Sequence, residues 1–348
     1  GYVAGISNQI GRNNSFFGTN AGTFNNADFN SFFGSGAGQS NTTGTNNTFV
    51  GTSAGVFNAT GSNKSFYGRD AGRNNTASNN AFFGADSGKA NTTGYDNSFF
   101  GRGAGASNQS GISNNFFGGN AGLANVSGSF NSYFGDGSGA LSNASYNAFF
   151  GSTSGFNNTS GTENSFFGFA AGNGNTTGVN NTFVGTNSGA LNGAGTDNSF
   201  FGRNAGRNNI SGQNSFFGSS AGLNNTGGAN NSFFGFEAGK ANTSATNNDF
   251  FGVFAGTQTD NSSFNAFFGA GSGFSNRNGG SNAFFGNSTG YYFTSGFSNT
   301  FLGAAAGFDV GSGTGLVTGD RNTLLGYVAG KGITSGSDNT FLGSQTTG

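Results

Sequence analysis

The side chains that could do chemistry in this 348-residue chain are carboxylates, hydroxyls, amides and a few cations, because it contains no His and no Cys. That composition excludes thiolate and imidazole metal sites, Cys nucleophiles and Ser-His-Asp triads. The 13 acidic residues are scattered, without a recurring carboxylate pair for acid–base work or the Asp-per-turn signature of calcium-binding β-rolls. The Gly-rich loops lack the Lys-Ser/Thr of a phosphate loop. We therefore predict no cofactor and no metal site, and we do not expect an enzyme.

Asparagine amides offer one candidate modification. The chain contains 20 Asn-x-Ser/Thr sequons, and many of them fall at one turn of the repeat described below. This enrichment predicts covalent glycans arrayed along one edge of the fold. The alternative is a ladder of Asn side chains followed by turn-favouring Thr and Gly, in which case the sequons have no meaning. The candidate glycosylation residues are Asn41, Asn58, Asn91, Asn108, Asn125, Asn158, Asn175, Asn209 and Asn242.

The charged residues are few and nearly balanced, with 12 basic and 13 acidic side chains and a formal net charge of −1. The sequence shows no basic field for nucleic acid and no polybasic segment for anionic lipid. No apolar run approaches the ~20 residues that span a bilayer. We expect neither nucleic-acid binding nor membrane insertion. The cluster of Arg69, Asp70 and Arg73, echoed by Arg203 and Arg207, predicts either lateral contacts or plain charged surface.

A repeated phrase, Asn-Ser-Phe-Phe-Gly, must position all of these groups. It returns 20 times at intervals of 16 or 17 residues, with one interval of 23 between Gly303 and Gly326. Asn opens the phrase in 19 of 20 units, and Lys64 is the exception. Such a short, sustained period predicts a solenoid in which each unit stacks on its neighbours. Aromatic residues kept in strict register argue against a disordered, low-complexity tract.

Aromatic pairs between Gly-rich turns predict one short strand in each repeat. A helix is excluded because Gly at this density would cost it ~1 kcal/mol per residue. We predict an all-β fold, a parallel β-solenoid (β-roll or β-helix) of about 20 coils with one 16–17-residue repeat per coil. Residues 1–303 form the regular repeats. Residues 304–348 form divergent repeats, in which six extra residues around Asp309 to Arg321, and Thr347 in place of a Gly, predict a cap or the approach to another domain.

Stacking would place the same repeat position of every coil in one column, giving stacked aromatic rings and amide ladders. Neighbouring strand residues point to opposite faces, so one Phe of each pair should fill the interior and the other should face outward. An outward stripe of this length should be covered by other copies of the chain. The alternative is a Gly bend that turns both rings inward, so that a monomer suffices. The core and assembly residues are Phe16, Phe17, Phe32, Phe33, Phe99, Phe100, Phe166, Phe167, Phe233 and Phe234, and the ladder residues include Asn14, Asn30, Asn47, Asn80 and Asn97.

The phrases at residues 299–303, 322–330 and 339–343 resemble the Asn-Thr-Phe-Leu-Gly-Tyr-x-Ala-Gly repeats of bacterial and phage tail-fibre-domain surface proteins. That resemblance implies a stalk, and in this family an intramolecular chaperone domain often assembles the stalk into trimers. A looser similarity joins the repeat to the Asn-Ser-Val-Ala-Ile-Gly heads of trimeric autotransporter adhesins, which are left-handed parallel β-rolls.

Composition, repeat and resemblance together predict a structural subunit of an extracellular fibre, filament or cell-surface stalk. We expect it to self-associate through stacked Phe and Asn columns, as a fibre or a trimer, with covalent glycans on its surface. The alternative is an adhesin or phage tail-fibre shaft that presents a binding tip.

Overall fold

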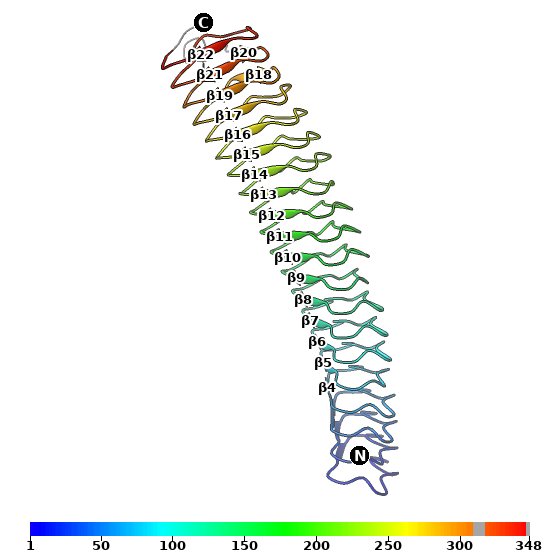
Figure 1. The fold of residues 1–348 in the computed structure, drawn as a ribbon. Helices are drawn as coiled ribbons and strands as arrows, with labels where there is room; N and C mark the ends of the chain where they lie inside the picture. Colours follow the sequence, from blue (N-terminus) through cyan, green and yellow to red (C-terminus); the bar gives the residue numbers. More distant parts are fainter. Residues whose placement is uncertain (309–316, 346–348) are drawn as a thin grey trace. The chain divides into compact units, whose positions relative to one another are not determined.

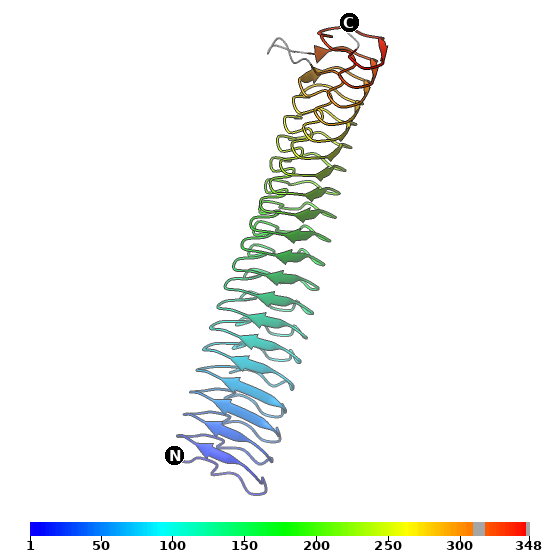
Figure 2. The ribbon, with the colours of Figure 1, turned by 90° about the vertical axis from the view of Figure 1, so that its left-hand side faces the viewer.

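The computed structural model describes residues 1–308 and 317–345, and these contain strands and turns but no helix (Figures 1 and 2). The predicted parallel β-solenoid is confirmed, because within each compact unit the repeats form coils, and the strand of one coil pairs in parallel with the strand of the next. The chain divides into two compact units, Gly1–Thr177 and Gly178–Gly348. Each unit is a stack of coils.

The first unit contains ten strands, one per coil. Every pair keeps the repeat in register, so that Phe16 lies beside Phe32 and Phe149 beside Phe166. The strands are β1 (Ser15–Phe17), β2 (Ser31–Phe33), β3 (Asn47–Val50), β4 (Lys64–Tyr67), β5 (Ala81–Phe83), β6 (Ser98–Phe100), β7 (Asn115–Phe117), β8 (Ser132–Phe134), β9 (Ala148–Phe150) and β10 (Ser165–Phe167).

The second unit continues the pattern with ten strands in its main sheet. These are β11 (Thr182–Val184), β12 (Ser199–Phe201), β13 (Ser215–Phe217), β14 (Ser232–Phe234), β15 (Asp249–Phe251), β16 (Ala266–Phe268), β17 (Ala283–Phe285), β19 (Thr300–Leu302), β21 (Thr323–Leu325) and β22 (Thr340–Leu342). A separate parallel pair joins β18 (Phe293–Ser295) to β20 (Val317–Thr318).

The long interval between Gly303 and Gly326 does not interrupt the main sheet. Thr300 of β19 lies beside Thr323 of β21, so the strands on the two sides of the extra residues pair directly. Residues 309–316 of the predicted insertion, and Thr347, lie outside the described residues. The predicted role of 304–348 as a cap or an approach to another domain stays a prediction.

Two Gly positions of each coil are fixed by close contacts, one with the next coil and one with the ring inside the same coil. At the end of the strand, Gly34 has a φ of 139°, and a Cβ there would lie 2.5 Å from the carbonyl oxygen of Gly51 in the next coil. Four residues later Gly38 has a φ of 57°, and a Cβ would lie 2.5 Å from the ring of Phe32. Both the left-handed backbone and the lack of space require Gly. The recurring glycines are therefore the corners that let coils approach to strand-pairing distance.

Candidate assembly surface

The first aromatic residue of each phrase forms an inner column that fills the coil. Phe32, Phe99, Phe166 and Phe233 are fully buried, as predicted, and Phe16 in the first coil is partly exposed. Successive rings stack face to face, with centroids 4.8 Å apart between Phe82 and Phe99 and 4.8 Å apart between Phe216 and Phe233. Such stacking combines the burial of a large apolar surface with ring–ring attraction. This column is the hydrophobic core of each unit.

The second aromatic residue forms an outer column on the opposite face of the same strands. Phe17, Phe33 and Phe167 are 72%, 42% and 40% exposed, whereas Phe100 and Phe234 are half-buried. Their rings also stack face to face, 4.6 Å apart between Phe100 and Phe117 and 4.6 Å between Phe234 and Phe251. The prediction that the two rings of a pair face opposite ways is confirmed, and the alternative that both turn inward is wrong. Inside such a run of rings, each ring is covered on its faces by its neighbours and leaves its edge open to solvent.

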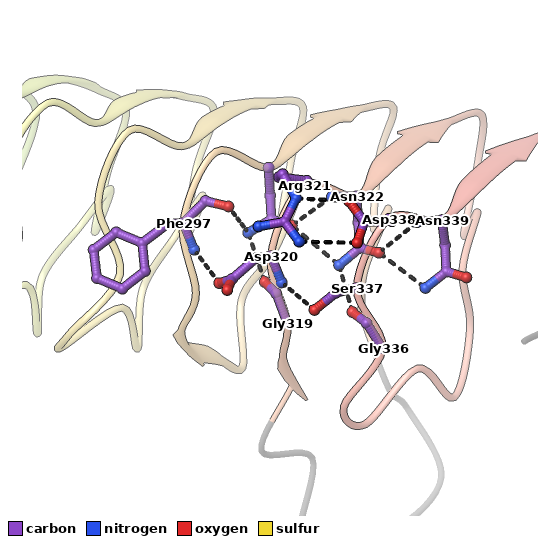
Figure 3. Close-up of polar contacts among 10 residues, drawn as sticks. Phe297, Gly319, Asp320, Arg321, Asn322, Gly336, Ser337, Asp338 and Asn339 are labelled. Atoms are coloured by element: carbon purple, nitrogen blue, oxygen red, sulfur yellow. Dashed lines mark hydrogen bonds and ion pairs between the residues drawn. The ribbon is translucent and has the colours of Figure 1, made fainter.

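The Asn that opens each phrase forms a buried ladder, which the sequence predicted. Its pattern of bonds alternates between side chain and backbone (Figure 3): the Asn339 backbone N–H donates to Asn322 Oδ1 at 3.1 Å, and Asn322 Nδ2 donates to the Gly336 carbonyl at 2.7 Å. The same pattern joins Asn30 to Asn47 at 3.0 Å. These buried amides form their hydrogen bonds within the chain and are not open to another copy. The prediction that copies associate through Asn columns is therefore corrected. The column holds one coil to the next within a chain.

A second Asn column lies at the turn where sequons are frequent, and many of its side chains bond directly to one another. Asn58 Nδ2 donates to Asn41 Oδ1 at 2.8 Å, and Asn125 Nδ2 donates to Asn108 Oδ1 at 2.9 Å. An N-linked glycan needs an amide nitrogen open to solvent, so the prediction of glycans here is wrong for the folded coil. All nine candidates are fully buried in this column: Asn41, Asn58, Asn91, Asn108, Asn125, Asn158, Asn175, Asn209 and Asn242.

Lys64 replaces the phrase-opening Asn in β4 and is 1% exposed. Its Nζ donates to Asn58 Oδ1 at 2.7 Å and to the Asn75 carbonyl at 3.2 Å, and it lies 5.7 Å from the centroid of the Phe66 ring. Desolvation by burial lowers the pKa of Lys64 to about 6, so the amine is neutral at pH 7. The sequence marked this position as an exception but gave no sign that the side chain would stay inside.

Tyr133 replaces Phe in the inner column and is also fully buried. Its hydroxyl donates to Ser142 Oγ at 2.9 Å. Ser142 stands where other coils place an Asn of the turn column, such as Asn125. The smaller residue leaves space for the phenol oxygen and supplies its hydrogen-bond partner. The two substitutions therefore compensate each other. Their coupling depends on a contact between residues nine positions apart in the sequence, and it is visible only in the folded coil.

Four aromatic residues just before the strand were not singled out from the sequence. Phe29, Phe130, Tyr146 and Phe264 have φ values of 58°, 59°, 62° and 63°, a left-handed conformation that aromatic residues rarely adopt. They are between 48% and 64% exposed, and the Phe130 and Tyr146 rings stack 5.3 Å apart. Their common place in the repeat was the available signal. They add exposed apolar surface just ahead of strands β2, β8, β9 and β16.

The cluster around Arg69 forms ion pairs within the chain. Arg69 Nη2 and Lys89 Nζ each lie 2.9 Å from the Asp86 carboxylate, and Arg73 Nε lies 3.8 Å from Asp70 Oδ1. The second unit has a similar pair, with Lys240 Nζ 2.8 Å from Glu237 Oε1. Exposed pairs of this kind contribute little to stability. A lateral role for these residues toward another copy stays a prediction.

The chain matches no protein-family model and no curated protein. Across residues 1–308 and 317–345, no three acidic side chains gather closely enough to hold a metal ion. The same part of the chain has no helix with the length and apolar character of a membrane span.

Proposed function

We propose that the protein is a structural subunit of an extracellular fibre, filament or surface stalk, and that copies associate through the outer aromatic column. The observation that carries this proposal is the long run of stacked outward rings in each unit, from Tyr67 to Phe167 in the first and from Phe201 to Phe285 in the second. Phe201, Phe217, Phe234, Phe251 and Phe268 are consecutive in the second unit, and each is half-buried and stacks on its neighbours.

Such a stripe costs free energy in water, because soluble monomers rarely expose a contiguous apolar surface of this extent. A second copy is a matched cover, since its rings would repeat at the same spacing along the same kind of sheet. The stacked rings are also rigid, and a rigid surface loses little conformational entropy when it is covered. Placement outside the cell rests on the resemblance of the repeat to surface-protein stalks.

The test replaces outer rings by a residue that keeps the strand. In a triple variant, Phe217→Thr, Phe234→Thr and Phe251→Thr, the β-branched Thr supports the sheet while the apolar stripe is interrupted. We expect the unaltered chain to sediment as an assembly and to form filaments in negative stain, and the variant to shift to monomer with an unchanged circular dichroism spectrum.

The matched control removes exposed apolar residues that lie outside the strands. Leu191 and Ile210 are 54% and 58% exposed, and Leu191→Thr with Ile210→Thr should leave association unchanged. An unaltered chain that is monomeric at every concentration, or a control that weakens association as much as the triple variant, would overturn the proposal.

A further inference from the structure

Most of the charged side chains of the second unit are separated by sign to the two sides of the outer column. We define the leading edge as the positions at the start of each strand and in the two residues before its Asn. We define the trailing edge as the corner after the strand, where the first, second and fifth residues beyond the Gly lie together. Lys240 and Glu237, which pair at 2.8 Å, illustrate how these trailing positions meet at one corner.

The leading edge is acidic. It carries Asp197, Asp249, Asp320 and Asp338, against one basic residue, Arg321. Arg321 is already engaged, because its Nη2 donates to Asp338 Oδ2 at 2.8 Å (Figure 3), and this bond holds the pKa of Asp338 below its usual value. Four acidic and one basic side chain leave this edge with a charge of −3 among the described residues.

The trailing edge is basic. It carries Arg203, Arg207, Lys240 and Lys331, against one acidic residue, Glu237, which leaves a charge of +3 among the described residues. Strand β12 shows the arrangement in one coil, since exposed Asp197 precedes the strand and exposed Arg203 follows it. The first unit has the same sense, with Asp28, Asp96 and Glu163 on the leading edge and Arg69, Arg73, Lys89 and Arg102 on the trailing edge. The net charges of these two edges are smaller in the first unit, because Arg12 lies on the leading edge and Asp70, Asp86 and Asp136 lie on the trailing edge.

This separation distinguishes the two ways in which outer columns can face each other. If the solenoid axes run parallel, a two-fold rotation about that direction reverses the strands and sets the leading edge of one copy against the trailing edge of the other. If the axes run antiparallel, the strand direction is kept and each edge meets its like. The first arrangement pairs −3 with +3, and the second pairs −3 with −3 and +3 with +3. Closed rings of three or more parallel copies also place leading beside trailing edges.

We infer that copies of the chain associate with their solenoid axes parallel, with the acidic leading edge of one copy facing the basic trailing edge of the next. This inference rests on the proposed self-association and adds its polarity. Charges at the rim of an apolar interface select orientation more than they add affinity. In the parallel pair, Asp197 of one copy faces Arg203 of the other across the stripe, because both flank β12 at the same height.

The test uses single spin labels, which the Cys-free chain accepts without background. Ser219→Cys, Ala270→Cys and Ala304→Cys place a label at the same trailing-edge position in three coils of the second unit. Parallel axes predict the same label-to-label distance at all three sites. Antiparallel axes predict distances that change strongly from site to site, because each coil adds ~4.8 Å along the axis and the offset counts twice.

A charge exchange checks the cause. Arg203→Glu with Arg207→Glu should weaken association at least fivefold at low salt, and adding Asp197→Arg with Asp249→Arg should restore it. Arg277→Glu alters the same kind of charge on a turn away from both edges and should have no effect. Association with site-dependent distances would overturn the parallel arrangement while leaving the proposed function standing. A chain that stays monomeric would overturn both.

Discussion

Two coils of the first unit depart from the repeat inside the core, and they are accommodated very differently. In the coil of β8, Tyr133 brings a hydroxyl into the aromatic column, and Ser142 in the neighbouring column changes with it and accepts its hydrogen bond. In the coil of β4, Lys64 brings an amine into the Asn column without any matching change. Its Nζ takes Asn58 Oδ1 as acceptor, and the side-chain amides of Asn75 and Asn91 in the next coils make no hydrogen bond among the described residues.

The two coils differ in whether each buried polar atom has a hydrogen-bond partner. A buried polar atom is inexpensive when a partner is supplied at the same height, and costly when it leaves other polar atoms unpaired. The β8 coil satisfies its extra atom by one exchange of residues. The β4 coil leaves a desolvated amine and two unpaired amides. We therefore expect the β4 coil to be the weaker of the two, and three substitutions test this contrast.

The largest effect should come from Lys64→Asn, which restores the ladder. The unfolded chain binds a proton on Lys64 below its ordinary pKa of 10.5, whereas the folded chain does so only below about 6. The free-energy cost of burying the Lys64 amine is therefore full below pH 6, falls as pH rises and is gone above pH 10.5. We expect Lys64→Asn to raise the stability of this coil at pH 7 by more than about 2 kcal/mol. Hydrogen exchange of the β4 amides measures this.

The pH dependence identifies the amine as the cause. Between pH 7 and 9 the stability of the unaltered coil should rise by about 1.4 kcal/mol per pH unit relative to Lys64→Asn, as expected for one proton. Lys64→Met is the control, because it removes the amine but not the ladder defect. It should lose the slope and gain less stability than Lys64→Asn. An unaltered chain whose β4 protection is flat across this range would contradict the buried neutral amine.

A smaller effect is expected from Ser142→Asn, which restores the common residue of the turn column beside Tyr133. Because the Tyr133 oxygen lies 2.9 Å from Ser142 Oγ, the larger amide has no space. We expect a loss of about 2 kcal/mol, as for other overpacked cores. Adding Tyr133→Phe recreates the pair found in the next coil, Phe149 with Asn158, and should recover most of the loss. Equal stability of the single and double variants in denaturant unfolding would mean that the two residues are not coupled.

The sequence predicted the coil, the strand, the inner ring and the outward ring, because a repeat imposes the same local physics 20 times. It did not decide between glycans and a ladder at Asn41 or Asn125, since accessibility depends on what the turn packs against. It also could not place the Lys64 amine or the Tyr133 hydroxyl. The hydrogen-bond acceptor of each depends on contacts between columns, which the sequence period does not reveal. The separation of acidic and basic edges was present in the sequence, yet it becomes visible only once the two sides of the strand are known.

The smallest effect should come from Tyr133→Phe alone, in the β8 coil, where the extra hydroxyl has a matched partner. The substitution removes one buried hydrogen bond, but Ser142 Oγ still accepts from Asn158 Nδ2 at 3.2 Å, so no polar atom is orphaned. We expect a loss of about 1 kcal/mol, the usual net value of such a bond. Burial raises the pKa of Tyr133, so spectrophotometric titration should show one fewer tyrosine resisting ionisation in the variant than in the unaltered chain with its 8 Tyr. A loss of stability as large as the gain from Lys64→Asn would contradict this contrast. It would mean that the β8 coil depends on its hydroxyl as strongly as the β4 coil is weakened by its amine.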